Sequence, residues 1–172
     1  MKIVALRLAL SVLPMGASSL HAARADRIDA RVQGRLTGSC GFDQSRDVRF
    51  ELGDVSALSL PEVGDVGSWV AGDIVTTGCF AVEKILMTFN APSAATDGHP
   101  ELFFASGGSK GVAIELQTQD GQAILPNDTN APLIWMPASQ GNRFGLRVRY
   151  RRIGALGVGD ANACIVVFID FA

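Results

Sequence analysis

The chain has 172 residues, of which 48% are hydrophobic and 19% are charged, and its formal net charge is −2 at pH 7. This length and composition predict one globular domain with an apolar core and exclude a disordered chain. The excess of acidic residues argues against nucleic acid as the main partner.

The first 25 residues have the pattern of an export signal. Two basic residues precede a mostly apolar stretch at 8–20, and Ala23-Arg24-Ala25 then places small residues where a signal peptidase cleaves, with Ala22 as the other cleavage point. A transmembrane helix is disfavoured because Pro14 and Gly16 interrupt a run shorter than the roughly 20 residues of a span. We therefore expect cleavage and export. Cleavage after residue 25 removes three of the 15 basic residues and none of the 17 acidic residues. The mature chain then has a formal net charge of −5.

The stretch 28–36, at the start of the mature chain, alternates strictly between two kinds of residue. Its apolar or small positions are Ile28, Ala30, Val32, Gly34 and Leu36. Because side chains of a strand alternate between faces, this pattern predicts a strand with one apolar row. A terminal segment is usually loose unless it docks into a sheet. The arm is therefore either the first strand of its own domain or a strand that fills a groove on a neighbouring subunit.

The remaining chain is predicted to be a series of short strands separated by turns. The expected strands lie at 47–52, 73–79, 83–89, 111–125 with a hairpin turn at Asp120-Gly121, 143–151 and 164–171. Residues 126–137 are expected to form a loop in which the apolar segment 133–136 packs. The last strand is apolar at almost every position, which is typical of a buried central strand. This organisation predicts an all-β antiparallel sandwich.

Cys40, Cys79 and Cys164 are the three cysteines of the chain. An exported protein forms disulfides in an oxidising compartment. Three thiols allow three single pairings, and the residues alone leave the choice between them open.

The sequence predicts no enzyme, metal site or cofactor. The mature chain has a single histidine, His99, in a polar loop, whereas Cys164 lies in a strand expected to be buried. One histidine and three cysteines without paired short spacing do not match a metal site.

Two groups of surface candidates have a structural and a functional interpretation. The arginines at 147, 149, 151 and 152 form a basic stripe, which on an alternating strand is most often a solvated face. Trp69 and Trp135 stack on a sugar if they are exposed, but buried core aromatics are commoner.

The chain after residue 25 resembles the pilin subunits of chaperone–usher fimbriae of the type 1 kind. The resemblance includes the arm with Gly34, a first strand at Val48–Val55, and residues 111–116 leading into the turn at Asp120-Gly121. The most specific match is a glycine fourteen residues from the end and an aromatic residue next to last, here Gly159 and Phe171.

Two departures from the family pattern are present. Phe171 stands where the family usually has tyrosine, and Cys164 is an additional thiol in the last strand. The role of this thiol is therefore an open question.

The resemblance implies an incomplete immunoglobulin-like sandwich that lacks its last strand. It divides the chain into a signal peptide (1–25), an N-terminal donor-strand extension (26–38) and a pilin domain (39–172). It also implies a disulfide between Cys40 and Cys79. The donor residues are then Ile28, Ala30, Val32, Gly34 and Leu36, and the acceptor groove and chaperone contact are formed by Gly159, Ile165, Val167, Ile169 and Phe171.

The function implied by the resemblance is a structural subunit of a fimbria that polymerises by donor-strand exchange and supports cell adhesion. The implied partners are neighbouring pilin subunits, a periplasmic pilus chaperone and an outer-membrane usher, with export through the periplasm to the cell surface. The alternative is a minor or tip subunit that binds a host sugar or receptor directly. A third possibility is a self-contained secreted sandwich whose arm pairs within its own chain.

Overall fold

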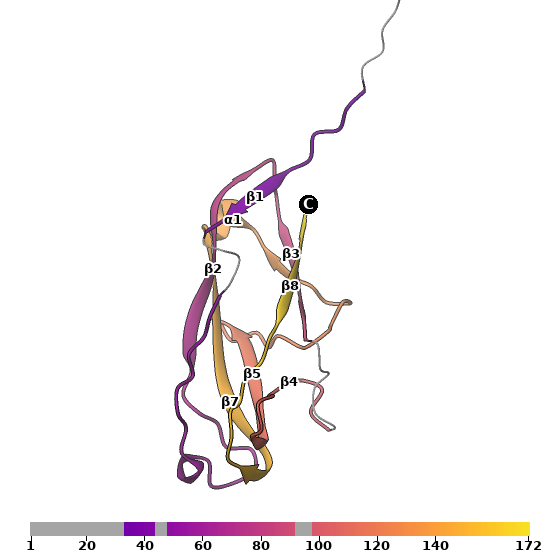
Figure 1. The fold of residues 1–172 in the computed structure, drawn as a ribbon. Helices are drawn as coiled ribbons and strands as arrows, with labels where there is room; N and C mark the ends of the chain where they lie inside the picture. Colours follow the sequence, from indigo (N-terminus) through magenta and orange to yellow (C-terminus); the bar gives the residue numbers. More distant parts are fainter. Residues whose placement is uncertain (1–32, 44–47, 92–97) are drawn as a thin grey trace, which may run out of the picture. The chain divides into compact units, whose positions relative to one another are not determined.

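The computed structural model describes residues 33–43, 48–91 and 98–172 (Figure 1). Contacts divide the chain into two units, Met1–Arg35 and Leu36–Ala172, and every described strand belongs to the second. The expected export signal and the arm residues Ile28, Ala30 and Val32 lie outside the described residues. In the described ranges, no helix is long and apolar enough to cross a membrane.

Eight described strands form two antiparallel sheets. The larger sheet has the order β1 (Ser39–Phe42), β2 (Val70–Phe80), β7 (Arg143–Gly157), β5 (Lys110–Thr118) and β4 (Phe103–Phe104). The smaller sheet has the order β6 (Leu133–Trp135), β3 (Ile85–Asn90) and β8 (Val166–Phe171). The described helices are two short turns, η1 (Ala57–Ser59) and α1 (Pro137–Gln140). The expected all-β antiparallel fold is confirmed.

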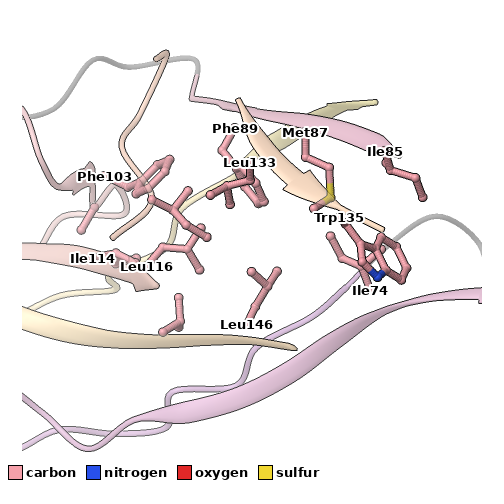
Figure 2. Packing of buried hydrophobic residues seen from close by; sticks show 13 residues of the cluster. Ile74, Ile85, Met87, Phe89, Phe103, Ile114, Leu116, Leu133, Trp135 and Leu146 are labelled. Carbon is pink, nitrogen blue, oxygen red and sulfur yellow. The ribbon is translucent and has the colours of Figure 1, made fainter. Parts of the chain in front are cut away.

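The core fills the space between the two sheets (Figure 2). The smaller sheet contributes the inward row of β3, which is Ile85, Met87 and Phe89, and the larger sheet contributes residues such as Leu116 and Leu146. Alternate residues along β3 are buried because a strand turns every second side chain to the same face. The apolar segment 133–136, expected to pack within a loop, supplies strand β6 and the fully buried Trp135.

The expected first strand at Val48–Val55 is wrong, because residues 48–56 belong to no strand in the structure. Phe50 and Leu52 nevertheless turn inward and pack against the core, with the Phe50 ring lying over Gly72 of β2. The alternating pattern therefore predicted correctly that Phe50 and Leu52 are covered, but not Val48, which is 43% exposed. It did not record main-chain pairing, because ladder hydrogen bonds also require a neighbouring strand in register.

The hairpin prediction is only partly right. Residues Asp120-Gly121 form the expected turn, in which the Gly121 amide donates to the Thr118 carbonyl at 3.0 Å. The strand expected after the turn is reduced to a single bridge between Gln117 and Ala123. In contrast, β7 continues to Gly157, beyond the predicted end at residue 151.

The connection from β7 to β8, residues 158–165, is held against the segment before β5. Ser106 and Asn162 exchange two backbone hydrogen bonds of 2.8 and 2.7 Å, and the Tyr150 hydroxyl donates to the Ala161 carbonyl at 3.1 Å. Gly159 has φ 153° and faces the backbone of Gly108, where a Cβ would come within 2.6 Å of the carbonyl carbon. Only glycine permits this close approach.

We predict that Gly111→Ala is far more destabilising than Gly53→Ala. Both glycines have a left-handed φ, 70° and 67°, so both substitutions cost about 1–2 kcal/mol in backbone strain. A Cβ at Gly111 would in addition overlap the Ala155 carbonyl oxygen in β7, whereas nothing lies within 4 Å at Gly53. Overpacking adds about 1–3 kcal/mol. Thermal unfolding of both variants measures this difference, and equal losses of stability would contradict it.

We also predict an alkaline loss of stability that depends on Tyr150, the one tyrosine in the chain. Burial raises the pKa of Tyr150, and the nearby carboxylates of Asp160 and Asp54 add to the effect. Since the pKa is higher in the folded state, the stabilisation is complete below about pH 10, the unfolded pKa, and is lost as pH rises through the folded pKa.

The control for this prediction is Tyr150→Phe. This variant loses the hydrogen bond to Ala161, which is expected to cost about 1 kcal/mol at neutral pH, and its stability should fall less steeply at high pH. Unfolding measured from pH 8 to strongly alkaline pH tests this, and tyrosinate absorbance reports the titration directly. Identical pH profiles for the two proteins would refute it.

Candidate functional site

β8 lies at an edge of the smaller sheet, where it pairs with β3 from Asn90↔Val166 to Ile85↔Phe171. In the described part of the chain, no strand pairs with its other side. Such an edge presents unpaired backbone N–H and C=O groups and is a template for another strand. Hydrogen bonds of 2.8 and 3.0 Å between Lys84 and Ala172 hold the far end of β8 to the start of β3. The edge is thus firmly positioned while it stays open.

The inward side chains of β8 and of the residue before it form a row of half-buried apolar groups. Ile165, Val167 and Ile169 are partly buried and pack against the core. Val167 and Ile169 lie opposite the buried residues of β3 in the pairing register. Phe171 continues the same row but is 38% exposed, and its ring stacks on Phe42 of β1 with 6.4 Å between centroids. The structure therefore brings together four of the five predicted acceptor residues.

The expectation that the last strand is buried and central is wrong. Its outward row is exposed, as at Val166 and at Phe168, whose side chain is 55% accessible. Cys164, expected inside the strand and buried, precedes β8, is exposed and is a free thiol. The uniform apolarity of a strand indicates burial on both faces, but burial also depends on which neighbours the fold supplies, and here β3 is the only strand partner described.

Gly159, the fifth predicted acceptor residue, lies in the connection before β8 and not in the row of inward side chains. Its glycine identity is explained by its contact with the Gly108–Ser109 backbone. The disulfide between Cys40 and Cys79 is confirmed, and it links directly paired positions of β1 and β2.

Leu36, the last apolar position of the alternating arm, is open to solvent, with 83% of its surface exposed. By contrast, a Cβ on Gly38 would overlap the carbonyl of Ala81, which shows that the chain is held closely just before β1.

The arginine stripe is a bonded cluster and not the freely solvated face that we expected. Arg149 donates to Glu115 at 2.8 Å, and Arg147 donates to Gln117 at 2.8 Å. Both guanidinium groups also lie over the ring of Trp69, at 4.1 and 4.6 Å from its centroid. The sequence lacks this information because the acidic and aromatic partners come from β5 and from the residue before β2.

Arg152 has different partners from Arg147 and Arg149. Its guanidinium donates to the carbonyl oxygen of Leu60 at 2.8 Å and also to that of Pro61. Its backbone amide donates to Asp65 at 2.8 Å. Arg152 therefore holds the long loop that contains η1 against β7.

The two tryptophans differ in their access to a ligand. Trp135 is fully buried, and its indole N–H donates to the Gly141 carbonyl at 3.1 Å, so it is a core residue as expected. Trp69 was also expected in the core, but it is half-buried and lies outside the described core cluster. Two arginines lie over its ring.

His99 pairs with Glu101 at 3.2 Å on a partly exposed turn. The pKa of Glu101 is lowered by a backbone hydrogen bond and, secondarily, by His99. Within the described ranges, no group of three or more His, Cys, Asp or Glu residues is arranged to hold a metal ion.

Comparisons with known proteins agree with this geometry. The fimbrial protein family model matches residues 28–172. The S-fimbrial adhesin protein SfaS of Escherichia coli O6:K15:H31 is 28% identical over 139 residues, which are 80% of each chain. Among solved structures, the P pilus rod subunit PapA superposes with a TM-score of 0.59 at 18% identity, over 77% of this chain and 99% of PapA.

The CupB6 tip adhesin of Pseudomonas aeruginosa also superposes with a TM-score of 0.59, at 26% identity over 69% of this chain. The match covers 35% of the CupB6 chain, so this protein spans about a third of that relative's length. With its two antiparallel sheets, its β1–β2 disulfide and the match over residues 28–172, the chain belongs to the fimbrial protein family of non-enzymatic subunits of surface fimbriae.

Proposed function

We propose that the mature chain is a structural subunit of a chaperone–usher fimbria and polymerises by donor-strand exchange. The observation that carries this proposal is the open edge of β8 beside a half-buried apolar row. A strand added at this edge would pair the free backbone groups and cover Ile165, Val167 and Ile169. The favourable free energy of adding this strand comes from main-chain hydrogen bonds and from burial of apolar surface.

The arm at 28–36 has the properties that the edge requires. Its apolar positions recur at every second residue, as do the half-buried side chains of β8. Nine residues at about 3.3 Å each span roughly 30 Å, longer than the roughly 20 Å of a six-residue strand. The exposure of Leu36 is consistent with an arm that serves another copy.

Donation from one copy to the next is a heterologous contact that does not close, so it produces a filament. Before assembly, the same edge exposes apolar side chains and unpaired backbone groups, which favours aggregation. This liability supports a periplasmic chaperone as a temporary partner. The outer-membrane usher enters the proposal through the match to the fimbrial protein family.

We predict that deleting residues 26–36 from the mature chain abolishes polymerisation and leaves an unstable domain. The full-length chain should form ladders that resist SDS, and the truncated chain should be stabilised by a peptide of residues 26–36. Sedimentation under oxidising conditions measures the oligomeric state of the full-length chain and of the truncated chain, with and without the peptide. If both forms are stable monomers, the domain is complete by itself and the proposal fails.

The matched control compares adjacent positions of the arm. Val32→Asp places a charge in the apolar row, where its burial is costly, and should strongly reduce polymer formation. Gln33→Asp places the same charge in the polar row and should leave polymers intact. Equal effects would show that the arm does not dock as an alternating strand.

Direct adhesion is the second candidate, favoured because two of the similar proteins are named adhesins. Trp135 is buried, so of the two tryptophans Trp69, with Arg147 and Arg149 over its ring, is the candidate for stacking on a sugar. If this face binds a glycan, Trp69→Ala should abolish glycan-array binding by the assembled fimbria while polymerisation continues. Binding that is unchanged in this variant, or absent from the native fimbria, would exclude Trp69 as the sugar platform.

A further inference from the structure

The short connection between the arm and the domain restricts how consecutive copies lie, if the arm is donated as proposed. Residues 37–39 alone separate Leu36 from Cys40, which the disulfide fixes to β2. Four Cα steps of 3.8 Å reach at most about 15 Å. The β1 end of the donating copy must therefore lie beside the point at which Leu36 leaves the acceptor.

The direction of β8 indicates which end of the acceptor this is. Every pair of named strands in the domain is antiparallel, and an antiparallel ladder is the more stable arrangement. β8 runs toward Phe171, which stacks on β1. An antiparallel arm would then leave the acceptor at the opposite end, beside Val166. The β7–β8 connection and the purple loop with η1 lie at this end of the domain (Figure 1).

Large apolar side chains are exposed at both ends that this arrangement brings together. Leu58 of η1 is 90% exposed and Val158 of the β7–β8 connection is 97% exposed. At the other end, Phe80 is 71% exposed and pairs with Ser39, the residue that directly follows the arm. A single exposed apolar residue is ordinary. Here, exposed apolar residues lie on both of the surfaces that the short connection 37–39 would bring together.

The geometry points to an end-to-end contact between consecutive copies of this chain. Phe80 of the donating copy packs against Leu58 and Val158 of the copy that receives its arm. This contact rests on the proposed donor-strand exchange and adds to it, because it buries side chains outside the β8 edge. Arg152 holds the η1 loop to β7 and so keeps the receiving surface in place.

A photo-cross-linking experiment tests this contact in full-length polymers. Phe80 is replaced by p-benzoyl-L-phenylalanine, which keeps an aromatic group, and the irradiated polymer is mapped by mass spectrometry. The expected cross-links join residue 80 to residues 57–63 or 157–160 of another copy. Val158→Asp in the same chain should lower their yield by roughly tenfold, since it places a charge in an apolar contact, while SDS-resistant ladders persist.

The matched control carries the same probe at Phe104, an exposed aromatic residue on β4 at the edge of the larger sheet. It should give no cross-links to 57–63 or 157–160 of another copy. If ladders form but residue 80 cross-links no better than residue 104, the end-to-end contact is wrong and donor-strand exchange stands. If no ladders form, donor-strand exchange fails and this contact fails with it.

Discussion

β8 is hydrogen-bonded to β3 along one side and, among the described residues, to no strand along the other. The half-burial of Ile165, Val167 and Ile169 is consistent with this, because a sandwich covers an edge strand from fewer directions than a central one. A domain with such an edge satisfies its backbone only by adding a strand or by leaving the groups to water. The proposed assembly follows from the first alternative.

The rest of the domain holds this edge in place. The Tyr150 hydroxyl and the Ser106–Asn162 bridge anchor the connection before β8, and the Lys84–Ala172 hydrogen bonds anchor the residue after it. A strand held at both ends is organised in advance for pairing, which lowers the entropy lost when another strand binds. The disulfide joins β1 to β2, directly after the end of the arm.

In the larger sheet, strand pairing gives the arginines of β7 polar partners that the sequence pattern does not predict. Arginines at every second position of β7 look like a solvated face, yet the register places Glu115 opposite Arg149 and Gln117 opposite Arg147. The Arg149 and Glu115 side chains are 21% and 13% exposed, so the pair is shielded from water more than a surface ion pair. This face is therefore tightly bonded within the domain.

The sequence by itself determined the all-β class and the strands around β2, β3 and β7, because a period of two is a local property of the chain. The acceptor face of residues 165, 167, 169 and 171 came from the family resemblance, because the last strand is apolar at almost every position. The family resemblance added the Cys40–Cys79 pair. Only the tertiary structure decided that 48–55 packs without pairing, that the last strand is an edge and that Cys164 is exposed. The physical reason is that burial and hydrogen bonding depend on neighbours distant in the sequence, which a local pattern does not specify.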